Sequence, residues 1–391
     1  MTKLDSYIDN YGEKPSEDPV KGFFQRLESI KMTASEFDEF CSNQPHILRS
    51  IRGHAFEVWF DESMARSGYD CRKVGGDEVV DRILNGRTLQ LKTPYWRGTI
   101  EGKVVAFRMH KTHGREKHPE ALYLPGKFAN FFVGLHPKEG VIICPAAELT
   151  TRGRLNPKLK WGEYIADPLP FDWNTPWLNR YDLISIDKDR LIFPDPSKSS
   201  ILPKMSKAIG YGDLEIIKAI MSKENFRVWN QLIVGSVREF HFMKFITQNR
   251  IELKEPTDLD TRSRVKVDYV YWQQSKKIRL RIQVKGLTEG LCRGNVLGCE
   301  TQCSHSRTPV RLYRRSDFEV LAIVIDPKRI PINTAKKLGV EWDAYNFLFM
   351  RMSDLPRHPR SLEWGDEYVK PVFRFDVSKQ KLNNVDLLPE Y

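Results

Sequence analysis

The stretch VVDRILNGRTLQLK, residues 79–92, has the pattern of a β-hairpin and sets the expectation for the whole chain. Asn85-Gly86 separates two runs of strand-forming residues, and this dipeptide is the strongest short-range signal for a two-residue hairpin turn. The sequence therefore predicts two antiparallel strands joined by a tight turn.

Three side chains of this hairpin suggest chemistry. Gln90 and Lys92 are two residues apart, so they point to the same face of their strand. The neighbouring strand can bring Asp81 beside them. A carboxylate, an amide oxygen and an ammonium group then converge, which predicts a metal site with a lysine next to the metal-bound water.

The same arrangement occurs again in VKVDYVYWQQSKKIRLRIQVK, residues 265–285. Asp268 lies on an apolar strand, a polar turn is expected near residues 273–277, and Gln283 and Lys285 follow two apart. One Asp…Gln-x-Lys pattern is weak evidence in a lysine-rich chain. Two copies in matching contexts indicate a repeated site.

The rest of the chain also repeats, which predicts a tandem duplication. RGHAFEVWF around Glu57 corresponds to VGSVREFHFMKF around Glu239, and both are expected to be helical. Further matching segments are 123–137 with 313–327 (without a gap), 161–173 with 364–377, and 178–184 with 382–388.

The expected domain plan follows from this repeat. Residues 1–33 form an N-terminal arm, 34–188 a first α/β domain, and 215–391 a second. Residues 189–214 are rich in Pro, Ser and Gly, which favours a linker.

Composition favours a protein with a polyanionic partner. The 391 residues carry a formal charge of +11, and nucleic acid is the commonest polyanion, although charge for solubility alone is the alternative. The chain has no apolar run of membrane-spanning length, and its first thirty residues lack the apolar core of a signal peptide. Six scattered cysteines do not suggest a disulfide scaffold, so a reducing cytoplasm is expected.

These motifs resemble the PD-(D/E)XK, or restriction-endonuclease-like, nuclease superfamily, and its type II restriction and Mrr-like members most closely. The resemblance covers the core of each unit, about residues 50–137 and 232–327. It implies a mixed β-sheet flanked by helices in each unit, with a hairpin that bears Asp and then Glu/Gln-x-Lys. Both units have Gln where many members have Glu, which removes one negative charge from each site. Carried over, the catalytic residues are Glu57, Asp81, Gln90 and Lys92 in the first unit, and Glu239, Asp268, Gln283 and Lys285 in the second.

The implied cofactor is Mg²⁺, one or two ions per site, because this hard cation prefers oxygen ligands. Asp81, Glu57 and Gln90 would hold it in the first unit, and Asp268, Glu239 and Gln283 in the second. The lysine would orient or deprotonate the attacking water and stabilise negative charge on the phosphate.

Two sites in one chain suit two antiparallel DNA strands, as in dimeric nucleases. The expected function is therefore a site-specific endonuclease that cuts double-stranded DNA as a monomeric pseudo-dimer, in restriction or phage defence, with a DNA methyltransferase as a candidate partner. Two alternatives stay open: a DNA-binding or regulatory protein on a nuclease scaffold with one or both sites inactive, and a structure-specific nuclease.

Basic segments follow both hairpins and supply candidate DNA contacts. These candidates are Arg97, Arg108 and Lys111 in the first unit, and Arg307, Arg311 and Arg314 in the second.

The second segment also holds Cys292, Cys299, Cys303 and His305, which could bind a structural Zn²⁺. Their spacing lacks the usual C-x2-C knuckle, so reduced thiols are the favoured interpretation.

The chain has no G-x-x-x-x-G-K-[ST] loop and no G-x-S-x-G elbow, which argues against an ATP-driven motor or an acyl-transfer enzyme.

Overall fold

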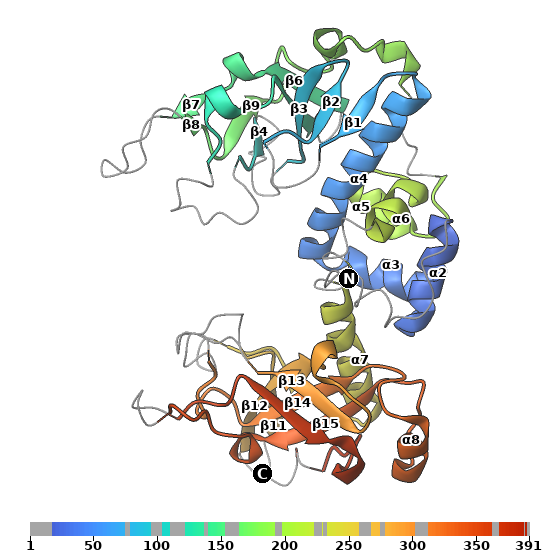
Figure 1. The fold of residues 1–391 in the computed structure, drawn as a ribbon, viewed down its shortest axis with the longest axis vertical. Coiled ribbons are helices and arrows are strands. Elements are labelled where there is room, and N and C mark those ends of the chain that lie inside the picture. Colours follow the sequence, from blue (N-terminus) through green and yellow to red (C-terminus); the bar gives the residue numbers. More distant parts are fainter. Residues whose placement is uncertain are drawn as a thin grey trace. The chain divides into compact units, whose positions relative to one another are not determined.

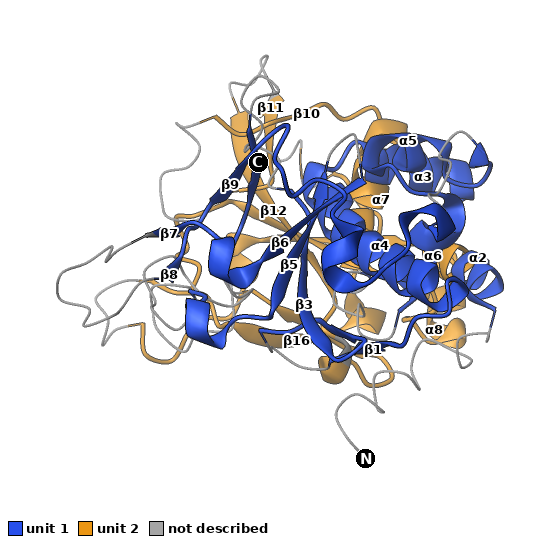
Figure 2. Ribbon diagram, turned by 90° about the horizontal axis from the view of Figure 1, so that it is seen from above, with its two compact units in different colours: residues 1–25, 33–229 blue, residues 26–32, 230–391 orange. Residues whose placement is uncertain are grey.

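The computed structural model divides the chain into two compact units (Figure 1, Figure 2). Unit 1 comprises residues 1–25 and 33–229, and unit 2 comprises residues 26–32 and 230–391. The structure describes residues 18–74, 79–94, 104–109, 122–136, 140–152, 164–191, 198–222, 229, 233–257, 267–273, 278–301, 312–361, 367–386 and 388.

Helices precede the sheet of unit 1 in the chain. Thr33 starts α3 with a capping box, since its side chain accepts from Glu36 N while the Glu36 carboxylate accepts from Thr33 N. A proline at the first turn begins the next helix, α4, and Gly68, with φ 77°, follows its end. These elements are α2 (Pro19–Ser29, shared by both units), α3 (Ala34–Ser42) and α4 (Pro45–Arg66).

The main sheet of unit 1 contains the predicted hairpin. Asn85 and Gly86, with φ angles of 48° and 80°, form the two-residue turn between β2 and β3, as predicted. Neighbouring strands run antiparallel except for one parallel pair, β3 with β5. The strand order is β1 (Cys71–Lys73), β2 (Arg82–Leu84), β3 (Arg87–Lys92), β5 (Phe131–His136) and β6 (Gly140–Pro145).

A small antiparallel sheet, β4 (Val104–Phe107) with β9 (Leu169–Asp172), packs on this main sheet. The Phe132 ring of β5 lies 4.9 Å from Phe107 and 5.4 Å from Phe171, measured between ring centroids. These buried aromatic rings form much of the core on this face. A further short pair is β7 (Thr151–Arg152) with β8 (Tyr164–Ile165).

Unit 2 has the same strand order and directions. Its sheet is β10 (Leu253–Lys254), β11 (Tyr269–Gln273), β12 (Ile278–Gly286), β14 (Val320–Ile325) and β15 (Asn346–Arg351), and the only parallel pair among these strands is β12 with β14. The other elements are α7 (Val234–Gln248), α8 (Ile332–Leu338), and the antiparallel pair β13 (Val296–Glu300) with β16 (Val372–Asp376).

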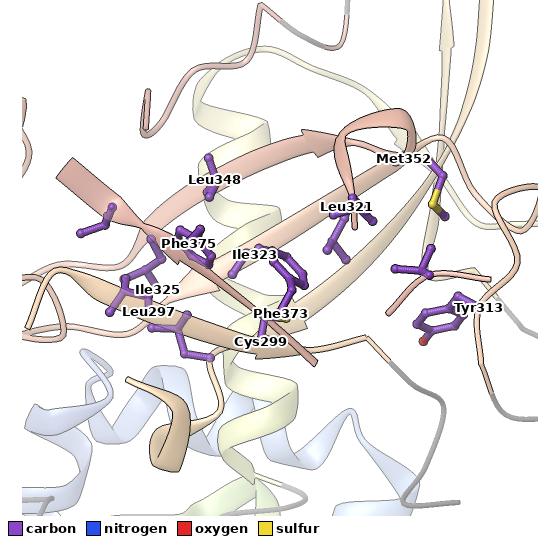
Figure 3. Close-up of a cluster of buried hydrophobic side chains, with 14 of the residues drawn as sticks. Leu297, Cys299, Tyr313, Leu321, Ile323, Ile325, Leu348, Met352, Phe373 and Phe375 are labelled. Atoms are coloured by element: carbon purple, nitrogen blue, oxygen red, sulfur yellow. The ribbon is translucent and has the colours of Figure 1, made fainter. Parts of the chain in front are cut away.

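Strand β14 is buried on both faces. One set of its alternating side chains, Val320, Ala322 and Val324, packs with Phe242 of α7. The opposite set, which includes Ile323, faces the β13–β16 pair, whose Phe373 and Phe375 fill the space between the strands (Figure 3). Because each fully buried aliphatic or aromatic side chain contributes about 1.5–3 kcal/mol, these two faces supply a large share of the stability of unit 2.

The two units share a strand order, and the similarity extends to local detail. Asn179 donates its N–H to Val141 O and accepts from Val141 N, at 2.7 and 3.1 Å. Asn383 exchanges the same two bonds with Phe347, at 2.7 and 2.8 Å. Both asparagines have a positive φ, of 54° and 55°. The mixed α/β class predicted from the sequence is confirmed.

The segment predicted as a linker, 189–214, has a different role. It holds α5 (Pro203–Ile209) and leads into α6 (Asp213–Met221), which packs against α4, so unit 1 extends through residue 229. The residues that suggested a linker mark helix ends: Pro begins α5, and Gly210, with φ 82°, ends it. The Asp213 carboxylate also accepts hydrogen bonds from Ser199 Oγ and three backbone N–H groups.

None of the helices in the described part of the chain combines the length and the apolarity needed to cross a membrane.

Candidate active site

The hairpin of unit 1 joins Asp81 to Gln90 by direct hydrogen bonds. Asp81 lies just before β2, where its N–H donates to Leu89 O at 2.9 Å. Its Oδ2 accepts from Gln90 Nε2 at 2.5 Å and from Leu91 N at 2.8 Å. Two donors on adjacent residues of β3 therefore hold one carboxylate oxygen.

This geometry leaves the amide oxygen of Gln90 directed away from Asp81. A carboxylate only accepts hydrogen bonds, so the amide must present its N–H group to Asp81. Gln90 is 1% exposed, and its Oε1 accepts no hydrogen bond from any described residue. Because a buried acceptor without a partner costs about 1–3 kcal/mol, this oxygen is suited to bind a cation or a water molecule.

Lys92 lies two residues further along β3. Its Nζ is 3.3 Å from the Tyr123 hydroxyl and 5.4 Å from the centre of that ring. Tyr123 is buried and thus a rigid support for the ammonium group. Burial raises the pKa of Asp81, as does the charge of Glu57, while the charge of Lys92 lowers it. Asp81 and Lys92 are thus electrostatically coupled.

Unit 2 builds the same arrangement. Asp268 Oδ2 accepts hydrogen bonds from Gln283 Nε2 and, at 2.7 Å, from Val284 N. Gln283 is 3% exposed, and its Oε1 again has no donor among the described residues. Lys285 Nζ lies 5.5 Å from the ring centre of the buried Tyr313. The spacing in the sequence therefore anticipated two Asp–Gln–Lys clusters with similar hydrogen bonds.

The helix glutamate of unit 1 has cationic partners. Arg82 Nη2 donates to Glu57 Oε2 at 3.1 Å, and Lys73 and His54 each lie 3.7 Å from the same carboxylate. Burial alone would raise the pKa of Glu57, but the His54 hydrogen bond and these positive charges lower it to about 2. The Arg82 side chain is 1% exposed and also forms a two-bond ion pair with Asp61, at 2.6 and 2.9 Å.

The helix glutamate of unit 2 has the opposite electrostatic environment. Burial, the negative charge of Asp268 and that of Glu255 raise the pKa of Glu239 to about 7, although Lys285 lowers it. Its residue surface is nevertheless exposed, so solvent screens part of this interaction. Glu239 and Asp268 therefore form a pair of repelling carboxylates beside Gln283, an arrangement that a divalent cation would stabilise.

Two sequence differences account for the contrast between the environments of Glu57 and Glu239. Arg82 directly follows the hairpin aspartate, and Tyr269 takes that place in unit 2. Asp61 lies four residues after the helix glutamate, and Met243 takes that place in unit 2. An ion pair in unit 1 is thus replaced in unit 2 by Tyr269 and Met243, both packed against the α7-side core.

Sequence reasoning missed the roles of Arg82, Tyr123 and Tyr313. The tyrosines had a signal, since they align across the repeat. Arg82 had none, because a charged residue beside a hairpin aspartate is usually exposed.

The donor set fits a hard cation such as Mg²⁺. Within the described residues no group of three or more His, Cys, Asp or Glu side chains is placed to hold a metal ion. The candidate sites instead combine carboxylates with an unpaired amide oxygen, and Mg²⁺ accepts few protein ligands because it retains several waters.

The predicted zinc site is described only in part. Cys303 and His305 lie outside the described residues. Cys299 packs in the core of unit 2, where burial raises the pKa of its thiol to about 12, and Cys292 donates its S–H to Thr288 O at 3.4 Å. Both are free thiols in the structure.

The DNA-contact candidates are likewise described in part, since Arg97, Lys111, Arg307 and Arg311 lie outside the described residues. Arg108 is 3.8 Å from Asp167. Arg314 is exposed, stacks over the Tyr368 ring, and directly follows Tyr313 of the second site.

No protein-family model, curated protein or solved structure matches this chain. The function must therefore be inferred from the geometry of the two sites.

Proposed function

We propose that this protein is a Mg²⁺-dependent endonuclease that cuts double-stranded DNA, with one active site in each unit. The observation that carries the proposal is the repeated Asp–Gln–Lys arrangement. In both units a buried amide oxygen without a described donor lies beside an aspartate, and a lysine follows two residues later.

The metal ligands would be oxygens of side chains that are hydrogen-bonded or electrostatically coupled to one another. Asp81 and Gln90 Oε1 would hold the cation in unit 1, and Asp268, Gln283 Oε1 and Glu239 in unit 2. Bound Mg²⁺ lowers the pKa of a water ligand and neutralises charge on a phosphate oxygen.

The protein residues around this position have separate roles. Gln90 and Gln283 donate from Nε2 to the aspartates, which would fix the carboxylates that hold the cation. Lys92 and Lys285 carry the positive charge that would orient the attacking water and stabilise the pentacoordinate phosphate. Tyr123 and Tyr313 would hold these ammonium groups in place.

Two sites in one chain support cleavage of both DNA strands by a single-chain pseudo-dimer. The charge of +11 suits a DNA partner. Sequence-specific restriction or phage defence is the activity that we favour, and a DNA methyltransferase would then protect the host DNA.

A second candidate function is DNA binding or regulation on the same scaffold. The engagement of Glu57 by Arg82 favours it for unit 1, because one predicted metal ligand is already paired there.

The test is incubation of the purified protein with supercoiled plasmid and with phage DNA at low salt, with Mg²⁺ or with EDTA. Discrete Mg²⁺-dependent fragments are expected, whereas a random smear or cleavage only at branched DNA would indicate another nuclease class. DNA that is retarded in a gel but never cut, across several divalent metals, would contradict the endonuclease proposal and favour the binding protein.

Single-lysine variants test the division of labour between the units. Lys92→Ala and Lys285→Ala should each leave a nicked circle as the end product, since one strand is cut per site. The double variant should bind DNA without cutting it, and linear product from either single variant would refute one strand per site.

A further inference from the structure

The two sites differ most in the partners of their helix glutamates. In unit 1, Arg82 Nη2 is 3.1 Å from Glu57 Oε2, and the same guanidinium forms two bonds to Asp61. Arg82 Nη1 also donates to the backbone oxygen of Asp81 at 2.8 Å. Four hydrogen bonds therefore fix this buried guanidinium directly beside the hairpin aspartate.

Such a guanidinium changes a cation site in two ways. It occupies the Glu57 carboxylate, and breaking a buried ion pair to release one partner is costly. It also places a permanent positive charge next to the ligands, because an arginine keeps its proton. Both effects weaken binding of a second cation at the same place.

Among its described residues, unit 2 has neither feature. Tyr269 and Met243 replace the ion pair, and they pack against the apolar core on the α7 side. The charged groups that act on Glu239 are the acids Asp268 and Glu255 and the single base Lys285. Unit 2 therefore offers two carboxylates to a cation where unit 1 offers one.

We infer that the two sites bind divalent cations unequally, with the tighter site in unit 2, and that Arg82 is the positioning residue that keeps Glu57 away from the metal in unit 1. This inference rests on the proposed function. Its consequence is an ordered reaction in which unit 2 cuts its strand first, and unit 1 cuts the other at higher metal concentration.

The first measurement is calorimetric titration of the full chain with Mn²⁺, without DNA. Two classes of site are expected, about tenfold apart in dissociation constant, because affinity for hard cations follows the number of charged ligands. Asp268→Asn should remove the tight class and Asp81→Asn the weak one. Two equal classes, or loss of the tight class in Asp81→Asn, would overturn the inference.

Matched glutamate variants identify the cause. Glu239→Gln should weaken the tight class by about tenfold, whereas Glu57→Gln should change the weak class by less than about threefold. The double variant Asp61→Met/Arg82→Tyr transplants the unit 2 residues into unit 1 and should tighten the weak class. Equal losses of Mn²⁺ affinity in the two glutamate variants would overturn the role of Arg82. This comparison tests that role even if the double variant does not fold.

Cleavage of supercoiled plasmid at limiting Mg²⁺ completes the test. A nicked intermediate should accumulate, and Lys285→Ala should abolish its early formation more strongly than Lys92→Ala does. Unequal Mn²⁺ sites without any cleavage would refute the proposed endonuclease function but support the inference that the two sites bind cations unequally. Equal sites with efficient cleavage would refute only the inequality, and the absence of any Mn²⁺ binding would refute both.

Discussion

The substitution Gln283→Glu tests the central geometry of the site. Gln283 Nε2 donates to Asp268 Oδ2, and the side chain is 3% exposed. Glutamate is nearly the same size but has no N–H group, so two carboxylates would meet at hydrogen-bond distance. A charge-assisted hydrogen bond contributes about 1.5–3 kcal/mol, and the repulsion of a partly buried carboxylate pair brings the expected loss of unfolding free energy to about 3 kcal/mol at pH 8.

The sign of the pH dependence follows from the same pair. Repulsion between the carboxylates raises their pKa in the folded protein, because the pair retains a shared proton. The destabilisation should therefore be small near pH 5 and grow as the pH rises through the raised pKa. A divalent cation should reverse it, by about 2.7 kcal/mol when free Mn²⁺ is roughly one hundred times its dissociation constant.

The assay is urea unfolding of wild type and Gln283→Glu at pH 5 and pH 8, each with EDTA or Mn²⁺. Gln90→Glu is the matched variant in unit 1 and should also lose stability at pH 8. If Gln283→Glu equals wild type at pH 8 in EDTA, the amide does not donate to Asp268, and the assignment of Oε1 as the free ligand is refuted.

Three further predictions use the same unfolding assay or plasmid cleavage. Glu57→Gln should lower the free energy of unfolding by about 2 kcal/mol at pH 7, because the pKa of Glu57 is lowered from 4.5 to about 2. This stabilisation is lost only as the pH falls through that range. An equal loss at pH 2 and pH 7 would contradict the prediction. Glu239→Gln should instead raise the free energy of unfolding by about 1 kcal/mol at pH 8 and not at pH 4. The reason is that the pKa of Glu239 is raised to about 7, while solvent screens part of the effect. The absence of a gain at pH 8 would contradict the prediction. Tyr313→Phe keeps the ring under Lys285 and should retain most of the cleavage rate of unit 2, whereas Tyr313→Leu should slow it about tenfold or more with little change in DNA affinity. Equal rates for both tyrosine variants would show that the ring does not position the lysine.

Much of the fold could be predicted because its signals are local. The Asn85-Gly86 turn needs positive φ at both residues, which few other dipeptides accept, and the hairpin then fixes which side chains share a face. The repeat was visible for a similar reason, since both copies must satisfy the same local constraints. Strand alternation placed the glutamine and lysine of each cluster on one face, and pairing within the hairpin brought the aspartate beside them.

Other features depend on contacts between distant parts of the chain. The α5–α6 pair resembled a linker because its Pro, Ser and Gly residues serve as helix ends, and only packing on α4 shows that it belongs to unit 1. The predicted boundary at residues 189–214 could not anticipate that packing. The strand register also depends on contacts between distant parts of the chain. Gln90 pairs with Phe132 while Gln283 pairs with Leu321, so the strand pairing differs by one residue from the ungapped alignment of 123–137 with 313–327.

The sequence by itself determined that the chain holds two hairpins, each with Asp, Gln and Lys on one face, because turn chemistry and strand alternation act over a few residues. Only the tertiary structure decided how the two sites differ. Arg82 reaches Glu57 and Asp61 across 25 and 21 residues of chain, and a long-range ion pair has no local pattern in the sequence. Whether a carboxylate is paired with a cation or faces another acid is thus a property of the folded unit.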